Sequence, residues 1–349
     1  MFCCRCSYAL PSSLFFTLYY LPFVPYSLKI NTMLRILAND GIDPIGKKLL
    51  EEAGFEVDTN HIPQADLVEG LKAYDAITVR SATKVRKDLI DACPNIRLIG
   101  RGGVGMDNID VDYARSKGLA VVNTPASSSL SVGELVFAHL FTGIRFLHDA
   151  NRKMPVEGAS KFNDLKKAYA KGIELRGKKI GIIGFGRIGR ETAKIALGLG
   201  MEVLAFDLFE VPDHLELRLA GDITVSCPVQ SVNMDDLIRN SDFISLHVPY
   251  AEMPILGEPE FAMMKDGVGV VNCSRGGTID EEALLNALNS GKVAFAGLDV
   301  FDNEPTPRTD ILSHARISLT PHIGASTNEA QERIGTELAN LIIDFFKIK

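Results

Sequence analysis

A glycine-rich turn between an apolar strand and a helix is the feature that most narrows the possible folds of this chain. Residues 179–183 predict a strand and 187–199 a helix, and the turn between them reads Gly184-Phe185-Gly186-Arg187-Ile188-Gly189. At this spacing Gly184 permits a tight turn, Gly186 lets the backbone approach a pyrophosphate, and Gly189 lets the helix pack close to the strand. Free N–H groups at the start of a helix favour an anion. The segment therefore predicts a Rossmann unit that binds a dinucleotide; the alternative is an ordinary strand–helix turn.

Asp207 decides which dinucleotide is expected. It ends the strand predicted at 203–206 and follows Gly189 by 18 residues, close to the roughly 20 typical of an acid that accepts from the adenosine ribose hydroxyls. A carboxylate there repels a 2′-phosphate, and Leu208-Phe209 follows in place of an arginine. We therefore expect NAD rather than NADP, and the alternative for Asp207 alone is a solvated carboxylate at a strand end.

The same alternation of strands and helices runs through the chain from residue 33. Such alternation implies parallel sheets covered on both faces. A capping box at Ser131–Glu134 predicts a long helix over 131–150, and a final helix is predicted over 327–346. The strands are expected at 34–37, 55–57, 76–79, 96–100, 119–122, 180–183, 203–206, 243–247, 268–272, 295–300 and 317–320.

These two series predict an α/β protein with two doubly wound parallel-sheet domains. We expect a substrate-binding domain at 33–126 and 325–349, with the dinucleotide-binding Rossmann domain, 127–324, inserted into it. The last helix is short for a domain of its own, so it should return to the first sheet. We interpret residues 1–32 as an atypical N-terminal extension with Met33 as the functional start, and the alternative is a targeting segment.

Composition excludes several classes of protein. The chain has 349 residues, 46% apolar and 23% charged, which is typical of a soluble globular protein. Its net charge of −7 disfavours nucleic acid as a partner. The apolar stretch 14–26 is interrupted by prolines and too short to span a membrane, which takes roughly 18 residues or more. The cysteines at 93, 227 and 273 are isolated, so we expect no metal site or disulfide and a cytoplasmic protein.

Three charged residues in the second series point to catalysis. Arg275 follows a predicted strand and can grip a carboxylate with two parallel hydrogen bonds. His322 suits a proton acceptor, because an imidazole can take up and release a proton, and Glu304 can orient its ring. Taken singly, these residues have plain alternatives: a surface ion pair, a structural histidine and a solvated turn. Together, downstream of a nucleotide fingerprint, they indicate hydride transfer to or from a hydroxy acid. Asp299 also ends a strand and can contact the nicotinamide end of the cofactor.

Several longer motifs add a resemblance that covers residues 33–349. With them the chain resembles the D-isomer-specific 2-hydroxyacid dehydrogenase family. The motifs are Val79-Arg80-Ser81-Ala82-Thr83-Lys84-Val85, Gly105-Met106-Asp107-Asn108, Asn123-Thr124-Pro125, Asn272-Cys273-Ser274-Arg275-Gly276-Gly277, Leu298-Asp299-Val300-Phe301 and Pro321-His322-Ile323-Gly324-Ala325-Ser326-Thr327, beside the glycine fingerprint.

The resemblance implies roles for individual residues. The family's catalytic Arg, Glu and His fall on Arg275, Glu304 and His322. The loop Gly103–Val104 would contact the substrate carboxylate and the nicotinamide. Arg80 and Arg101, with Arg145 from a neighbouring subunit, would face a substrate phosphate. The cofactor contacts fall on Arg187, Ile188, Asp207, Val248, Cys273 and Asp299.

The resemblance further implies NAD-dependent oxidation of D-3-phosphoglycerate to 3-phosphohydroxypyruvate, the entry step of serine synthesis. Alternatives are a reductase of glyoxylate or hydroxypyruvate, or another D-2-hydroxyacid dehydrogenase. A more remote alternative is a corepressor-like protein that senses NAD(H). A homodimer is expected, built on the helix at 131–150 and the polar tract after it, and a C-terminal regulatory domain is not expected.

Overall fold

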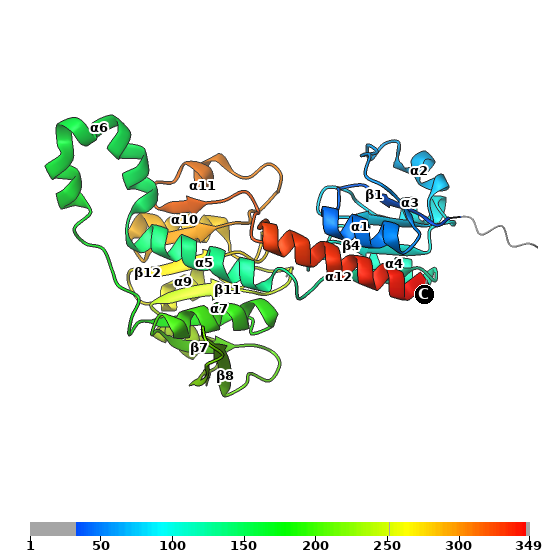
Figure 1. Cartoon of the computed structure of the whole chain (residues 1–349). Coiled ribbons are helices and arrows are strands. Elements are labelled where there is room, and N and C mark those ends of the chain that lie inside the picture. Colours follow the sequence, from blue (N-terminus) through cyan, green and yellow to red (C-terminus); the bar gives the residue numbers. More distant parts are fainter. Residues whose placement is uncertain (1–32, 251, 347–349) are drawn as a thin grey trace, which may run out of the picture. The chain divides into compact units, whose positions relative to one another are not determined.

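Two large parallel sheets with helices around them make up most of the part of the chain that the structure describes (Figure 1). The structure is a computed structural model and describes residues 33–250 and 252–346. The interpretation of residues 1–32 lies outside this part. The α/β class predicted from the alternation of strands and helices is confirmed, because every pairing within the two large sheets is parallel.

The first sheet has five strands in the order β2-β1-β3-β4-β5. The helices between its strands begin and end with ordinary signals: Asp43 caps α1 by accepting from the Ile45 N–H, with Pro44 as the first helical residue. The strands are β1 (Arg35–Ala38), β2 (Glu56–Asp58), β3 (Ala76–Val79), β4 (Leu98–Arg101) and β5 (Ala120–Asn123). The helices are α1 (Pro44–Glu52), α2 (Leu67–Gly70), η1 (Leu71–Ala73), α3 (Lys87–Ala92) and α4 (Val111–Ser116).

The last helix, α12 (Asn328–Phe346), packs against this first sheet (Figure 1). Its Leu338 shares an apolar cluster with Ile36 and Leu98. At the crossing with α1 the two backbones approach so closely that a Cβ on Gly46 would lie 2.6 Å from the Gly335 carbonyl oxygen. The chain thus leaves the first sheet after β5 and returns to it with α12. The domain limits stated above stay a proposal.

The second sheet has seven strands in the order β10-β7-β6-β11-β12-β13-β14. The strand order reverses between β6 and β11, and in such sheets a ligand binds in the crevice at the carboxyl ends of the strands beside that point. The strands are β6 (Lys179–Ile183), β7 (Glu202–Phe206), β10 (Gln230–Ser231), β11 (Phe243–Leu246), β12 (Val268–Asn272), β13 (Val293–Leu298) and β14 (Ile317–Leu319). The intervening helices are α7 (Arg187–Gly198), α8 (Met234–Asn240), α9 (Glu258–Met263), α10 (Glu281–Ser290) and α11 (Thr309–Ser313).

The helix predicted over 131–150 is two helices, so this prediction was wrong. Helix α5 runs from Ser129 to Ile144 and α6 from Leu147 to Ala168, so most of the polar tract is helical. The break falls where Phe146 adopts a left-handed conformation, φ 57°. Ser131 is no cap, because it is buried inside α5 and its hydroxyl donates to the Gly324 carbonyl. In the described part of the chain no single helix is long and apolar enough to cross a membrane, and α5 and α6 pass that test only together, across a 54° bend.

A short antiparallel hairpin between β7 and β10 was also missed. It consists of β8 (His214–Arg218) and β9 (Thr224–Pro228). Leu215 and Leu217 of β8 alternate with exposed residues and pack on the same apolar cluster as α7. The period of two was present in the sequence, but the segment is too short for that pattern to stand out.

Candidate active site

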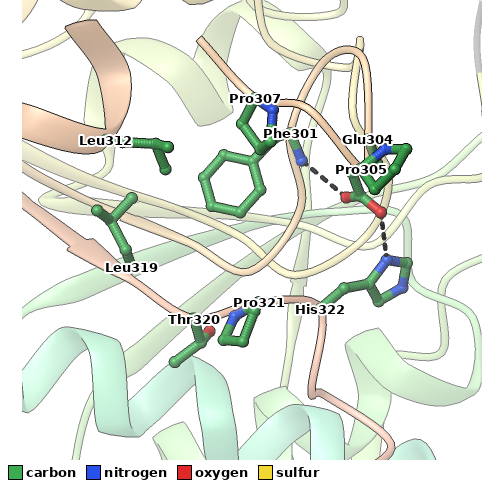
Figure 2. Close-up of a pocket in the computed structure, with 9 residues that line it drawn as sticks. All are labelled: Phe301, Glu304, Pro305, Pro307, Leu312, Leu319, Thr320, Pro321 and His322. Atoms are coloured by element: carbon green, nitrogen blue, oxygen red, sulfur yellow. Dashed lines mark hydrogen bonds and ion pairs between the residues drawn. The ribbon is translucent and has the colours of Figure 1, made fainter. Parts of the chain in front are cut away.

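His322 and Glu304 form a hydrogen-bonded pair at the carboxyl end of β14 (Figure 2). His322 Nδ1 lies 2.8 Å from Glu304 Oε2, and Glu304 Oε1 accepts from the Phe301 N–H at 2.9 Å. Burial raises the pKa of Glu304, but the hydrogen bonds from His322 and Phe301 outweigh burial and place it below its usual value. Glu304 is therefore ionised at neutral pH. It holds the proton of a neutral His322 ring on Nδ1, which leaves Nε2 free to accept another.

The Nε2 side of His322 faces open space. The His322 side chain is 44% exposed, and the pair borders an apolar pocket of about 420 Å³ (Figure 2). A proton acceptor has to reach the hydroxyl of a substrate, so this exposure agrees with the role expected for His322. The residues of the apolar pocket are Phe301, Glu304, Pro305, Pro307, Leu312, Leu319, Thr320, Pro321 and His322.

Arg275 follows the carboxyl end of β12. Its side chain is held by Asp107, which lies in the loop between β4 and α4 of the first sheet. Its Nε donates to Asp107 Oδ2 at 2.9 Å, and its Nη1 donates to the Ser274 carbonyl at 2.6 Å. The guanidinium passes so close to Gly105 that a Cβ there would lie 1.6 Å from Arg275 Nη2. The Arg275 fork is thus fixed in direction, with Nη2 left as a donor for an anion.

One cavity of about 650 Å³ brings the predicted trio together. Arg275, Glu304 and His322 all line it, and so does Arg101 of β4. A carboxylate clamp and a proton acceptor therefore face the same space. We call this cavity the reaction pocket. Its other lining residues are Ser81, Asp107, Asn108, Tyr250, Glu252, Pro254, Gly276, Gly277, Phe301, Asp302 and Asn303.

The predicted dinucleotide site is a second cavity of about 380 Å³, which we call the cofactor pocket. The reaction and cofactor pockets share Asp107 and Arg275, so a ligand in one adjoins a ligand in the other. Of the predicted cofactor contacts, six line it: Val104, Gly186, Arg187, Ile188, Val248 and Cys273. Burial raises the pKa of the Cys273 thiol well above its usual value, so this residue is a neutral wall of the pocket rather than a nucleophile.

The glycine turn has the geometry that its fingerprint requires. Gly184 adopts φ 91°, and a Cβ on Gly189 would lie 2.1 Å from the Gly184 carbonyl oxygen. No atom lies within 4 Å of the Cβ position of Gly186, so backbone is open to a ligand there. The start of α7 thus borders the cofactor pocket, and the N–H groups at a helix start favour an anion such as the pyrophosphate of a dinucleotide.

Asp207 and Asp299, two acidic residues predicted to contact the cofactor, accept hydrogen bonds from other groups of the protein. Asp207 accepts from the N–H groups of Phe185 and Phe209, so it braces the glycine turn. Asp299 is 1% exposed and lines neither pocket; its carboxylate accepts from Thr320, Ile323 and Gly324.

Of the predicted substrate residues, Arg101 lines the reaction pocket and Val104 the cofactor pocket, whereas Arg80, Gly103 and Arg145 line neither. Arg101 lines the reaction pocket, and burial, followed by the charges of Arg275 and Arg80, lowers the pKa of Arg101 to about 10. The Gly103 N–H donates within the protein, to Thr124 Oγ1 at 2.8 Å. Arg145 lies exposed at the end of α5, beside Gly172, and lines neither pocket of this chain.

Asp107 and Asn108 are site residues to which sequence reasoning assigned no role. Asp107 pairs with Arg275, and the Asn108 amide donates to the carbonyls of Arg80 and Thr83. Both belong to the Gly105–Asn108 motif, so the signal was present. No local sequence pattern shows that Asp107 pairs with Arg275, which lies 168 positions further along the chain.

Comparison with known proteins agrees with this geometry. The model of the D-isomer-specific 2-hydroxyacid dehydrogenase NAD-binding domain matches residues 137–324. A hydroxypyruvate reductase of Thermotoga maritima is 44% identical over 314 residues, which is 88% of this chain and 97% of that protein. A D-3-phosphoglycerate dehydrogenase of Methanocaldococcus jannaschii is 39% identical over 89% of this chain, which spans only 57% of that longer protein.

A solved structure extends the likeness to three dimensions. The D-lactate dehydrogenase of Aquifex aeolicus, complexed with NAD and lactic acid, has a TM-score of 0.72 at 28% identity and covers 90% of this chain and 95% of its own. The family model spans more than half of the chain, and the relatives align over nearly all of the part that the structure describes. The chain therefore belongs to the D-isomer-specific 2-hydroxyacid dehydrogenase family and is an NAD-dependent enzyme that acts on the CH–OH group of a D-2-hydroxyacid.

Proposed function

We propose that the enzyme oxidises D-3-phosphoglycerate to 3-phosphohydroxypyruvate, the entry step of serine synthesis. The observation that carries the proposal is a second arginine in the reaction pocket. Arg101 is largely buried there beside Arg275, and its Nε–H, also buried, has no hydrogen-bond partner among the described residues. Its Nη1 donates to the Gly102 carbonyl at 3.1 Å, and a phosphate would give the rest of the guanidinium further acceptors together with a balancing charge. Arg80 lies near enough to add to the positive potential at Arg101.

The residues of the site divide the proposed reaction between them. Arg275 binds the substrate carboxylate through its free Nη2 side, with Asp107 holding the guanidinium. His322 takes the proton of the C2 hydroxyl on Nε2, and the carboxylate of Glu304 stabilises the imidazolium that forms. NAD, when bound, supplies the acceptor for the C2 hydride. The glycine turn, Arg187, Val248 and Cys273 would hold it.

A second candidate substrate is hydroxypyruvate, which lacks the phosphate. It is favoured by the match over nearly the whole length of the Thermotoga maritima hydroxypyruvate reductase. The two candidates differ in what Arg101 and Arg80 do. In the first they bind a phosphate, and in the second they only add positive potential to the pocket.

Steady-state kinetics in the direction of reduction separates the two substrates. We expect kcat/KM with NADH to be about 100-fold higher for phosphohydroxypyruvate than for hydroxypyruvate, because a site built for a polar group discriminates strongly against its absence. The Arg80→Ala variant should raise KM for phosphohydroxypyruvate about tenfold and leave hydroxypyruvate within about twofold. No side-chain hydrogen bond or ion pair is formed by Arg80 in the described part of the chain, so its removal leaves no partner unpaired.

The matched control for that variant is Arg115→Ala, which removes an exposed arginine from α4. It should leave both substrates unchanged. Equal kcat/KM for the two substrates, or an equal effect of Arg80→Ala on both, would contradict the phosphate assignment and favour hydroxypyruvate.

We also propose a homodimer, with α6 as its contact surface. The apolar residues of α5 are mostly buried within this chain, so they do not call for a partner. Helix α6 instead extends away from the sheet and carries exposed apolar side chains, at Leu147, Met154, Val156 and Phe162 (Figure 1). Light scattering should give twice the mass of the chain, and Val156→Asp with Phe162→Asp should give the single mass. A monomeric wild-type protein would contradict the proposal.

The proposed location is the cytoplasm. Cys93, Cys227 and Cys273 are unpaired thiols, as is usual for proteins of a reducing compartment. Fractionation of cells that express the chain is the direct measurement.

A further inference from the structure

A buried histidine outside both pockets is tied by hydrogen bonds to the turn that carries His322. His139, on α5, is 1% exposed. Its Nδ1 lies 2.9 Å from Ser318 Oγ and its Nε2 lies 3.0 Å from Thr320 Oγ1. Thr320 Oγ1 in turn donates to Asp299 Oδ1 at 2.6 Å. Ser318, His139, Thr320 and Asp299 thus form one continuous chain of hydrogen bonds.

The order of donors in this chain is determined. Thr320 has one hydroxyl proton and gives it to Asp299, so Thr320 Oγ1 can only accept from His139. His139 must then carry its proton on Nε2, and its Nδ1 must accept from the Ser318 hydroxyl. Burial lowers the pKa of His139 despite the nearby charge of Asp299, so the ring is neutral and has a single N–H to give.

Asp299 connects this chain of hydrogen bonds to the backbone around His322. Its two carboxylate oxygens accept from the N–H groups of Ile323 and Gly324, both at 2.8 Å, and its carbonyl accepts from the His322 N–H at 2.8 Å. The backbone of His322 has φ 54°, a conformation that residues other than glycine seldom adopt. Such a conformation persists only where its surroundings fix it, and Asp299 and Thr320 are those surroundings.

Helix α5 is built to hold His139 at this place. A Cβ on Gly297 of β13 would lie 2.5 Å from His139 Cβ, so the glycine makes room for the imidazole against the sheet. Eight residues before His139 on the same helix, Ser131 donates to the Gly324 carbonyl at 2.7 Å. Helix α5 therefore contacts both ends of the turn that carries His322, at Thr320 and at Gly324.

We propose that His139 is a positioning residue for the reaction, which acts through Thr320 and Asp299 to hold the His322 ring where it accepts the substrate proton. The proposal rests on the proposed role of His322 as the proton acceptor. His139 itself touches neither the reaction pocket nor the cofactor pocket.

The sharpest test compares Thr320→Val with Thr320→Ser in the full chain. Valine keeps the shape of threonine but neither donates to Asp299 nor accepts from His139, whereas serine does both. We expect Thr320→Val to lower kcat about tenfold or more, with KM for the 2-oxo acid within about threefold. Thr320→Ser should restore kcat to within about twofold, and Thr224→Val, on exposed β9, should change neither value.

The tautomer of His139 gives a readout that does not depend on activity. In protein labelled with ¹⁵N-histidine, the His139 signals are identified by their loss in His139→Gln. They should show a neutral ring protonated on Nε2. Ser318→Ala removes only the bond to Nδ1, so it should keep the fold and the Nε2 tautomer, which Thr320 still selects, and lower kcat about two- to threefold. If Thr320→Val does not fold, Ser318→Ala carries the test alone.

Three outcomes would overturn the proposal. They are a wild-type His139 protonated on Nδ1, a kcat of Thr320→Val equal to that of the wild type, or a loss of thermal stability in Ser318→Ala and Thr320→Val without a change in kcat. Failure of the proposed role of His322 looks different. In that case His322→Asn itself retains turnover, whatever the Thr320 variants do.

Discussion

Replacing His322 by asparagine should lower kcat about 1,000-fold while the protein still folds and binds NADH. A positioned general base contributes roughly 10²- to 10⁴-fold, and the asparagine amide can still donate to Glu304 but cannot take up a proton. The side chain is exposed, so little packing is lost. Turnover of the better 2-oxo acid with NADH, and the NADH affinity by fluorescence titration, measure the two expectations separately.

The matched control is His314→Asn, at the end of α11. Among the described side chains, His314 has one hydrogen-bond partner, Asn289, with 3.4 Å between Nε2 and Oδ1. It lines neither the reaction pocket nor the cofactor pocket. It should keep full activity. Glu304→Gln should lie between the two, with kcat lowered about 10- to 100-fold, because the ring keeps a hydrogen-bond partner but loses the balancing charge. A His322→Asn enzyme within tenfold of the wild type would refute the proton-acceptor role.

Strands could be predicted from the sequence where each is a short apolar run that ends at glycine or polar residues. The strands at 76–79, 180–183 and 268–272 were expected within a residue or so of their observed bounds, because Gly and polar residues end them abruptly. The break at Phe146 was not predictable in this way. Ile144 and Leu147 continue the apolar pattern of the helix, and only the tertiary structure selects the left-handed residue between them.

The site shows a similar division between local and long-range information. Arg275 and His322 could be found because each stands at the carboxyl end of a strand, where a parallel sheet gathers its functional side chains. The partner of Arg275 could not, because Asp107 comes from the other sheet and no local pattern joins the two. His139 could not be linked to the site for the same reason: its partners, Ser318 and Thr320, are about 180 positions away.

The second large effect is expected on replacing Arg275, and it depends on the charged residues that line the reaction pocket. Arg275 and Arg101 both line it, and only Arg275 has a carboxylate partner, Asp107. The Asp107 side chain is 58% exposed, so it screens the guanidinium only in part. An anionic substrate therefore enters a pocket lined by two guanidinium groups and by the His322–Glu304 pair, with Glu252 and Asp302 also in its lining.

Arg275→Ala should lower kcat/KM for the 2-oxo acid about 1,000-fold, mostly through KM. The free N–H groups of the guanidinium, on Nη2 and the second one on Nη1, are lost as donors to the carboxylate, and such charged hydrogen bonds contribute roughly 1.5–3 kcal/mol each. Arg275→Lys should recover only about tenfold, because an ammonium group cannot reproduce the planar fork. The cofactor pocket keeps its glycine turn, so NADH affinity should change by no more than about threefold.

The companion variant Asp107→Asn separates binding from positioning. It keeps a side-chain oxygen for Arg275 Nε but removes the charge, so the guanidinium stays in place and attracts the substrate slightly more strongly. KM should fall or stay within about twofold of the wild type. If Arg275 instead served only to join the two sheets through Asp107, both variants would lower thermal stability alike and neither would change KM. An unchanged KM in Arg275→Ala is thus the result that would remove the carboxylate clamp from the mechanism.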